Sequence, residues 1–190
     1  MTPLLELPAF RQRVHLMSVE HYHRLGELAV LSDDVELLRG IVVTKMPKSP
    51  LHELVAQKLM RSLLAKIPHG FEVRRESPLT LADSEPEPDI SVVQGSADDW
   101  ASAHPSTAHL VVEVAVSSTA LDEGKAEIYA EAGIPEYWLV RPEERAMDVF
   151  REATAHGYRS RTTLFDDDQL QCASLPGVQL SVAEILPARD

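Results

Sequence analysis

The architecture of the chain follows from one stretch, HLVVEVAVSSTALDEGKAEIYAEAGIPEYWLV, which covers residues 109–140. Residues 110–116 form a short, valine-rich apolar run, and residues 137–140 form a second one. Runs of this length and composition are typical of buried strands. The residues between them have a helical pattern, which Gly133 and Pro135 end. The stretch therefore predicts a β-α-β unit.

One ionisable residue, Glu113, interrupts the first apolar run. A carboxylate that is removed from water needs a partner charge or a metal ion. Lys125, near the start of the predicted helix, can supply the partner charge. Upstream, Asp89 directly precedes another apolar run, residues 90–93, and brings a second carboxylate to the start of a strand. The spacing and composition of these residues indicate an acidic site that can bind a divalent cation.

Other segments predict the elements that surround this unit. A helix is expected from Ser18 to about Leu28, and a hairpin or bulged strand pair over residues 35–46. Ser49 and Pro50 have the pattern of a helix start, and apolar spacing predicts a helix of about sixteen residues from there. Further strands are expected over residues 71–81, 146–151 and 158–164.

The carboxylates and the lysine have an arrangement that resembles the PD-(D/E)XK nuclease superfamily. Pro88 and Asp89 stand as the PD pair, and Glu113 stands as the second acid. The lysine of that motif normally follows the acid by two residues, where this chain has Ala115. The resemblance therefore assigns the role of the lysine to Lys125.

Further segments resemble one branch of that superfamily, the Uma-type restriction endonuclease family. They are, in chain order, VELLRG at 35–40, KMPKSPLH at 45–52, EPD at 87–89, VEVA at 112–115 with the serines at 117–118, DEGK at 122–125, and AGIPEYW at 132–138. Such segments in the right order are much more specific than the short PD and acid skeleton. Two positions depart from the pattern: Arg39 stands where the family more often has an acid, and Val116 stands where an aspartate commonly precedes the serine pair.

The resemblance implies an α/β fold of the restriction-endonuclease-like type, a mixed β-sheet flanked by α-helices. It implies a single domain over residues 1–190, with its core at about 18–186. The expected activity is that of a magnesium-dependent endonuclease that hydrolyses phosphodiester bonds in DNA. The expected working unit is a homodimer.

The same resemblance assigns roles to particular residues. Asp89 and Glu113 are expected to bind Mg²⁺ or Mn²⁺, which are hard cations that prefer oxygen ligands. Lys125 is expected to orient the attacking water or to offset developing negative charge. Glu36 is expected to act as a third acid or to support the metal ligands, and His52 is an accessory candidate at the start of a helix.

Composition restricts the class of protein. The chain of 190 residues has the length of one ordinary domain, and it has no apolar run as long as a membrane span. Its first residues lack the pattern of a signal peptide, and its single cysteine, Cys172, excludes a disulfide framework. These features predict a cytoplasmic protein without a membrane partner.

The net charge of −12 is unusual for a protein that binds DNA through its phosphates. Basic residues gather in one third of the chain, where the simplest interpretation is a solvated face. They are Lys45, Lys48, Lys58, Arg61, Lys66, Arg74 and Arg75.

Three alternatives to the endonuclease stay open. One is a binding or regulatory module that keeps the nuclease fold without turnover, which Arg39, Val116 and the acidic composition favour. A second is a phosphoester hydrolase that acts on a small nucleotide, since such a substrate does not require a long anion to be held. The third is a buried Glu113–Lys125 ion pair with a purely structural role.

Overall fold

The computed structural model describes residues 13–116 and 119–188. Ser117 and Ser118, which belong to the family pattern, lie outside the described residues. The centre of the molecule is a mixed six-stranded sheet with the strand order β3-β4-β5-β6-β7-β8. Its strands are β3 Phe71–Arg75, β4 Ile90–Gln94, β5 Leu110–Val114, β6 Glu136–Arg141, β7 Ala146–Thr154 and β8 Gly157–Phe165.

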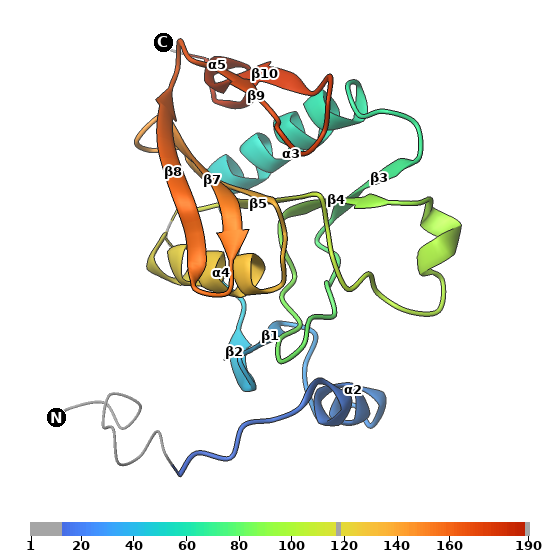
Figure 1. The fold of residues 1–190 in the computed structure, drawn as a ribbon. Coiled ribbons are helices and arrows are strands. Elements are labelled where there is room, and N and C mark those ends of the chain that lie inside the picture. The colour runs from blue at the N-terminus through green and yellow to red at the C-terminus, as the bar shows by residue number, and fades with distance from the viewer. Residues whose placement is uncertain (1–12, 117–118, 189–190) are drawn as a thin grey trace, which may run out of the picture.

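The predicted β-α-β unit is confirmed. Helix α4, Thr119–Glu131, connects β5 to β6, and these two strands pair in parallel, with Val112 opposite Trp138. The other neighbouring pairs in the sheet are antiparallel. The crossover therefore places β5 and β6 side by side at the middle of the sheet and leaves α4 on one of its faces (Figure 1).

Helices cover both faces of the sheet. On one face, α3 (Pro50–Leu64) packs its buried side chains, including Leu59, against valines of β4 and β5. The hairpin of β9 (Gln169–Gln171) and β10 (Gln179–Ser181), followed by α5 (Val182–Ile185), extends this layer. On the other face, Ile128 and Tyr129 of α4 pack against Val111, Tyr137 and Leu139. Since side chains alternate along β5, Glu113 lies on the α4 face with Val111.

A small hairpin brings Glu36 to the α4 side of the molecule. The predicted strand pair is found as β1 (Val35–Leu38) and β2 (Ile41–Thr44), which follow helix α2 (Val19–Glu27). Gly40 makes the turn with φ +73°, and a Cβ there would lie 2.7 Å from Leu16 Cβ and 2.9 Å from a main-chain oxygen, so only glycine fits without a shift. Leu37 forms an isolated bridge to Glu85, which fixes the hairpin beside the loop that precedes β4.

The strand expected over residues 71–81 is shorter than predicted, because β3 ends at Arg75. Glu76 has a left-handed φ of +47°, and Pro78 has no N–H for a strand ladder. The chain turns back instead, and Glu76 N donates to Asp89 O at 3.2 Å. This loop, residues 76–89, delivers Asp89 to the start of β4. Among the described residues, no helix is both long and apolar enough to cross a membrane.

The buried carboxylate of Glu136, at the start of β6, binds the segment between β9 and β10 to the sheet. Glu136 is fully buried and accepts hydrogen bonds from Trp138 Nε1 (2.9 Å), Arg151 Nη2 (2.9 Å) and the N–H groups of Ala173 (2.8 Å) and Ser174 (3.1 Å). We expect Glu136→Gln to lower the free energy of unfolding by about 2–4 kcal/mol, because an amide cannot accept from all of these donors and Arg151 loses its counter-charge.

Urea denaturation measures this loss directly. The matched control is Glu143→Gln, at an exposed position, for which the expected change is within about 0.5 kcal/mol. A change at Glu136 as small as that of the control would contradict its role as an anchor for the segment before β10.

Candidate functional site

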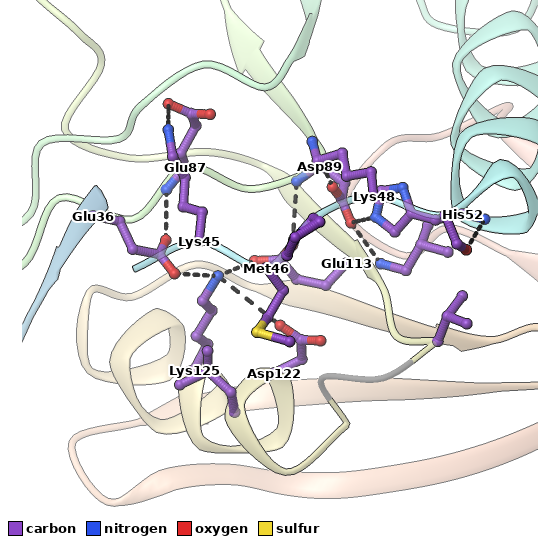
Figure 2. Close-up of a pocket in the computed structure, with 15 residues that line it drawn as sticks. Glu36, Lys45, Met46, Lys48, His52, Glu87, Asp89, Glu113, Asp122 and Lys125 are labelled. Atoms are coloured by element: carbon purple, nitrogen blue, oxygen red, sulfur yellow. Dashed lines mark hydrogen bonds and ion pairs between the residues drawn. The ribbon is translucent and has the colours of Figure 1, made fainter. Parts of the chain in front are cut away.

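Carboxylates and cations from separate parts of the chain meet in one cavity of about 80 Å³ at the end of β5, between the start of α3 and helix α4 (Figure 2). The hairpin, the segment after β2, the start of α3, the loop before β4, β5 and α4 all contribute to its lining. The ionisable residues that line it are Glu36, Lys45, Lys48, His52, Glu87, Asp89, Glu113, Asp122 and Lys125.

The antiparallel pairing of β4 with β5 brings Asp89 and Glu113 together. Ile90 lies opposite Val112 in this register, so the residue before β4 lies beside the end of β5. In each of the two segments, a main-chain N–H donates to the carboxylate carried by the other. Asp89 N donates to Glu113 Oε2 at 3.2 Å, and Val114 N donates to Asp89 Oδ2 at 2.8 Å. Both carboxylates are buried, with Asp89 6% and Glu113 3% exposed.

Lys125 connects the hairpin to the sheet. Its Nζ lies 2.9 Å from Glu36 Oε1, 3.1 Å from Glu113 Oε1 and 3.9 Å from Asp122 Oδ1. Lys125 is only 5% exposed, and Asp122 and Tyr129 on the same face of α4 are also buried, so this face points into the protein, not to solvent. Tyr129 lies one turn further along α4 and donates its hydroxyl to Glu113 Oε1 at 2.9 Å.

The N-terminus of α3 supplies the partners of Asp89. Ser49 caps this helix by accepting from His52 N at 3.2 Å, as the sequence predicts. The cap directs the His52 side chain toward the sheet, where Nε2 lies 2.9 Å from Asp89 Oδ2. On the preceding segment, Lys48 Nζ lies 3.3 Å from Asp89 Oδ1 and 3.2 Å from Glu76 Oε2.

The two central carboxylates differ in protonation. Burial raises the pKa of Glu113 to about 8; the ammonium of Lys125 acts in the opposite direction, and the charge of Asp89 adds to the rise. Burial also opposes ionisation of Asp89, but the hydrogen bond and charge of His52, the Val114 N–H and Lys48 together hold the pKa of Asp89 below its usual value. The surroundings of Asp89 therefore favour its ionised form more than those of Glu113 do.

The chemistry of the donors fits a hard divalent cation, which prefers carboxylate oxygens. In the metal-free arrangement these oxygens already have partners, because N–H, hydroxyl or ammonium groups contact both oxygens of Asp89 and both of Glu113. Within residues 13–116 and 119–188, no group of three or more His, Cys, Asp or Glu side chains is arranged to hold a metal ion. A cation at these oxygens would therefore compete with the present partners.

All five candidates from the sequence line the cavity: Glu36, His52, Asp89, Glu113 and Lys125. Other residues that contact these candidates were missed, among them Asp122, Tyr129 and Lys48. The spacing of Asp122 and Tyr129 from Lys125 was a usable signal, but a sequence pattern does not reveal which face of a helix is buried. Lys48 carried no such signal, since it belongs to a set of basic residues whose simplest interpretation was a solvated face.

The fold of this chain is similar to that of a protein of known structure. A solved structure from Anabaena variabilis ATCC 29413, described as "a putative nuclease belonging to DUF820", is similar with a TM-score of 0.69. The two chains are 17% identical, and the similarity covers 85% of this chain and 96% of the other. At this identity the similarity shows the fold alone, and it confirms the predicted mixed sheet with flanking helices. No curated protein matches the chain.

A protein family, in contrast, matches most of the chain. It is Uma2, described as "Putative restriction endonuclease", and the match runs over residues 19–183. This range includes every residue that lines the cavity, and helices α3 and α4 on the two faces of the sheet. The chain belongs to the Uma2 family.

Proposed function

We propose that the protein is a divalent-metal-dependent endonuclease that hydrolyses phosphodiester bonds in DNA. The observation that supports this most strongly is the convergence of Glu36, Asp89, Glu113 and Lys125, from four separate segments, in one buried cavity. The description of the Uma2 family, "Putative restriction endonuclease", supports the choice of substrate.

Each residue has a role in this proposal. Asp89 and Glu113 would hold Mg²⁺ or Mn²⁺ through their oxygens. Such a cation, when bound, supplies a water of lowered pKa and stabilises charge on the scissile phosphate. Lys125 orients the attacking water or offsets the charge that develops on the phosphate, and Glu36 holds Lys125 in place from the hairpin, at 2.9 Å. His52 orients Asp89 from the opposite side, at 2.9 Å.

The proposal also extends to the setting of the reaction. We place the protein in the cytoplasm and take a homodimer as the working unit. The acidic net charge of −12 means that DNA must be held mainly by local groups at the site and not by a long-range field.

A plasmid assay tests the activity. We expect supercoiled plasmid to be nicked or linearised in Mg²⁺ or Mn²⁺ and to stay intact with a chelator. Glu113→Gln is expected to lower the rate at least about a hundredfold, because the proposed second ligand loses its charge. Equal cleavage with and without a chelator would contradict a metal-dependent reaction, and activity on free nucleotides alone would indicate a small-nucleotide phosphoester hydrolase.

Metal binding should depend on pH. Because the pKa of Glu113 is raised to about 8, a cation that binds there at lower pH must first displace a proton. We expect the association constant for Mn²⁺ to rise by up to about tenfold per pH unit between about pH 6 and pH 8, and to level off above that range. Calorimetry in two buffers of different ionisation enthalpy measures the released proton. An association constant that does not change over this range would contradict the raised pKa.

One observation favours a second candidate, a nuclease-fold module that binds without turnover. Both oxygens of Asp89 and both of Glu113 already contact protein donors in the metal-free site. A folded protein that binds DNA without cleaving it in either metal would identify this candidate.

A further inference from the structure

We propose that Lys48 is an exchangeable counter-cation of the site. Its ammonium occupies the position on Asp89 Oδ1 that a divalent cation needs, and it is released to the mouth of the cavity when the cation binds. This inference rests on the proposed metal-dependent function. It adds a residue that competes with the metal ion and is then free to pair with a phosphate.

The two oxygens of Asp89 have different surroundings. Oδ2 accepts from Val114 N at 2.8 Å and lies 2.9 Å from His52 Nε2, and both of these partners belong to the packed interior. Oδ1 instead faces Lys48, whose Nζ lies 3.3 Å away. Oδ1 is therefore the oxygen that a cation can reach by displacing a single side chain.

The two lysines that neutralise the central carboxylates differ in freedom. Lys125 has a side chain only 6% exposed, projects from a helix and contacts two buried carboxylates, so its departure would leave buried charges without compensation. Lys48 lies between β2 and α3, outside any helix or strand, and its side chain is 30% exposed. Its flexible four-carbon stem lets the ammonium move without a change in the fold. Of the two, Lys48 is the one that can leave at low cost.

The positive charge of Lys48 explains why it must leave when a cation binds and what it can do afterwards. An ammonium and a divalent cation on the same carboxylate oxygen repel each other strongly at such short distance. Lys48 already lies 3.2 Å from Glu76, so this carboxylate offers the displaced ammonium a partner beside the cavity that Lys48 lines, where a phosphate would approach. The ammonium is then available as a point-charge partner for that phosphate.

A titration of Mn²⁺ into three variants tests the exchange. Lys48→Met removes the competing charge and keeps a similar stem. Lys45→Met is the matched control, because Lys45 lines the same cavity, is 25% exposed and pairs with Glu87 at 3.1 Å, which is not a proposed ligand. Lys48→Arg keeps the charge. We expect Lys48→Met to bind Mn²⁺ about tenfold more tightly than the wild type, and the other two variants to stay within about threefold of it.

The outcomes separate the inference from the function that it rests on. Mn²⁺ binding by Lys48→Met that is no tighter than by Lys45→Met overturns the exchange and leaves the proposed function standing. Absence of Mn²⁺ binding in both the folded wild type and Lys48→Met overturns the metal-dependent function itself. Far-UV circular dichroism and thermal melting establish that each variant is folded before it is titrated.

A second readout follows the released ammonium. The anisotropy of a short fluorescent DNA duplex is measured with and without Ca²⁺, which also binds oxygen ligands. We expect Ca²⁺ to increase the affinity for the duplex in the wild type. In Lys48→Met the increase should be several-fold smaller, because there is no Lys48 ammonium for the metal to release toward the phosphate. An equal increase in both proteins would overturn the transfer of Lys48 to the phosphate.

Discussion

Replacement of Lys125 by methionine should remove both activity and a large part of the stability. The side chain is 6% exposed and its ammonium lies within 3.1 Å of two buried carboxylate oxygens, on Glu36 and Glu113. Removing one partner of a buried ion pair leaves an uncompensated charge, so we expect the free energy of unfolding to fall by about 3–5 kcal/mol. Cleavage is expected to fall below detection, since the proposed orienting cation is gone. Urea denaturation and the plasmid assay measure the two effects.

A matched control is Arg39, in the turn between β1 and β2, which also forms an ion pair with a residue of α4. Arg39 pairs with Glu131 of α4 at 2.9 Å, but its side chain is 40% exposed. Solvent screens that pair, so Arg39→Met should cost less than about 1 kcal/mol and leave cleavage unchanged. If Lys125→Met is no less stable than Arg39→Met, the buried network does not hold the hairpin to the sheet. Stability restored in Lys125→Met by the added change Glu36→Gln would identify the uncompensated charge as the cause.

Replacement of Asp89 by asparagine should affect chemistry more than folding. An amide oxygen can still accept from Val114 N, so the join between β4 and β5 is expected to persist. The negative charge that holds His52 and Lys48 is lost, and with it the proposed metal ligand. We expect metal-dependent cleavage to fall by about a thousandfold or more. Initial rates of plasmid nicking at saturating Mg²⁺ measure this effect.

Glu87→Gln is the control for Asp89→Asn. Glu87 lines the same cavity and pairs with Lys45, but its side chain is 23% exposed and it does not belong to the proposed ligands. Its replacement should change the rate by less than about tenfold. Equal rates of cleavage by the Asp89→Asn and Glu87→Gln variants would show that the reaction does not depend on an ion at Asp89.

The sequence alone was sufficient to predict the central β-α-β unit. Strand β5, helix α4 and strand β6 lie where the valine-rich runs and the Gly133 stop predict them, because short buried strands and a connecting helix depend mainly on local pattern. The approach of Asp89 to Glu113 was expected from the family motif, since their positions at the ends of neighbouring strands follow from the fold. Their roles as metal ligands stay a prediction.

The rest of the site depends on contacts between distant segments. Glu36 reaches Lys125 only because Leu37 pairs with Glu85 and fixes the hairpin against the loop before β4. No local pattern encodes that bridge. The partnership of Lys48 with Asp89 likewise depends on how the segment after β2 crosses the cavity. The periodicity of a sequence predicts helices and strands, but it does not predict contacts between single side chains from distant segments.

The cluster of basic residues illustrates the same limit. Lys48 and Lys45 line the cavity, whereas Lys66 pairs with Glu184 at 3.3 Å and Arg74 donates to Pro78 O at 3.2 Å on other parts of the surface. Basic residues that are neighbours in the sequence therefore lie at separate places in this fold. Positive charge at the site comes from individual lysines, each paired with a carboxylate.

The central claim is that Asp89 and Glu113 form one metal site, and calorimetric titration of Mn²⁺ and Mg²⁺ tests it without a choice of DNA substrate. We predict that the wild type binds the cation and that binding disappears in both Asp89→Asn and Glu113→Gln, while the two variants stay folded. Absence of binding in the folded wild type, or binding that survives both substitutions, would contradict the account and favour a nuclease fold that works without a metal at this site.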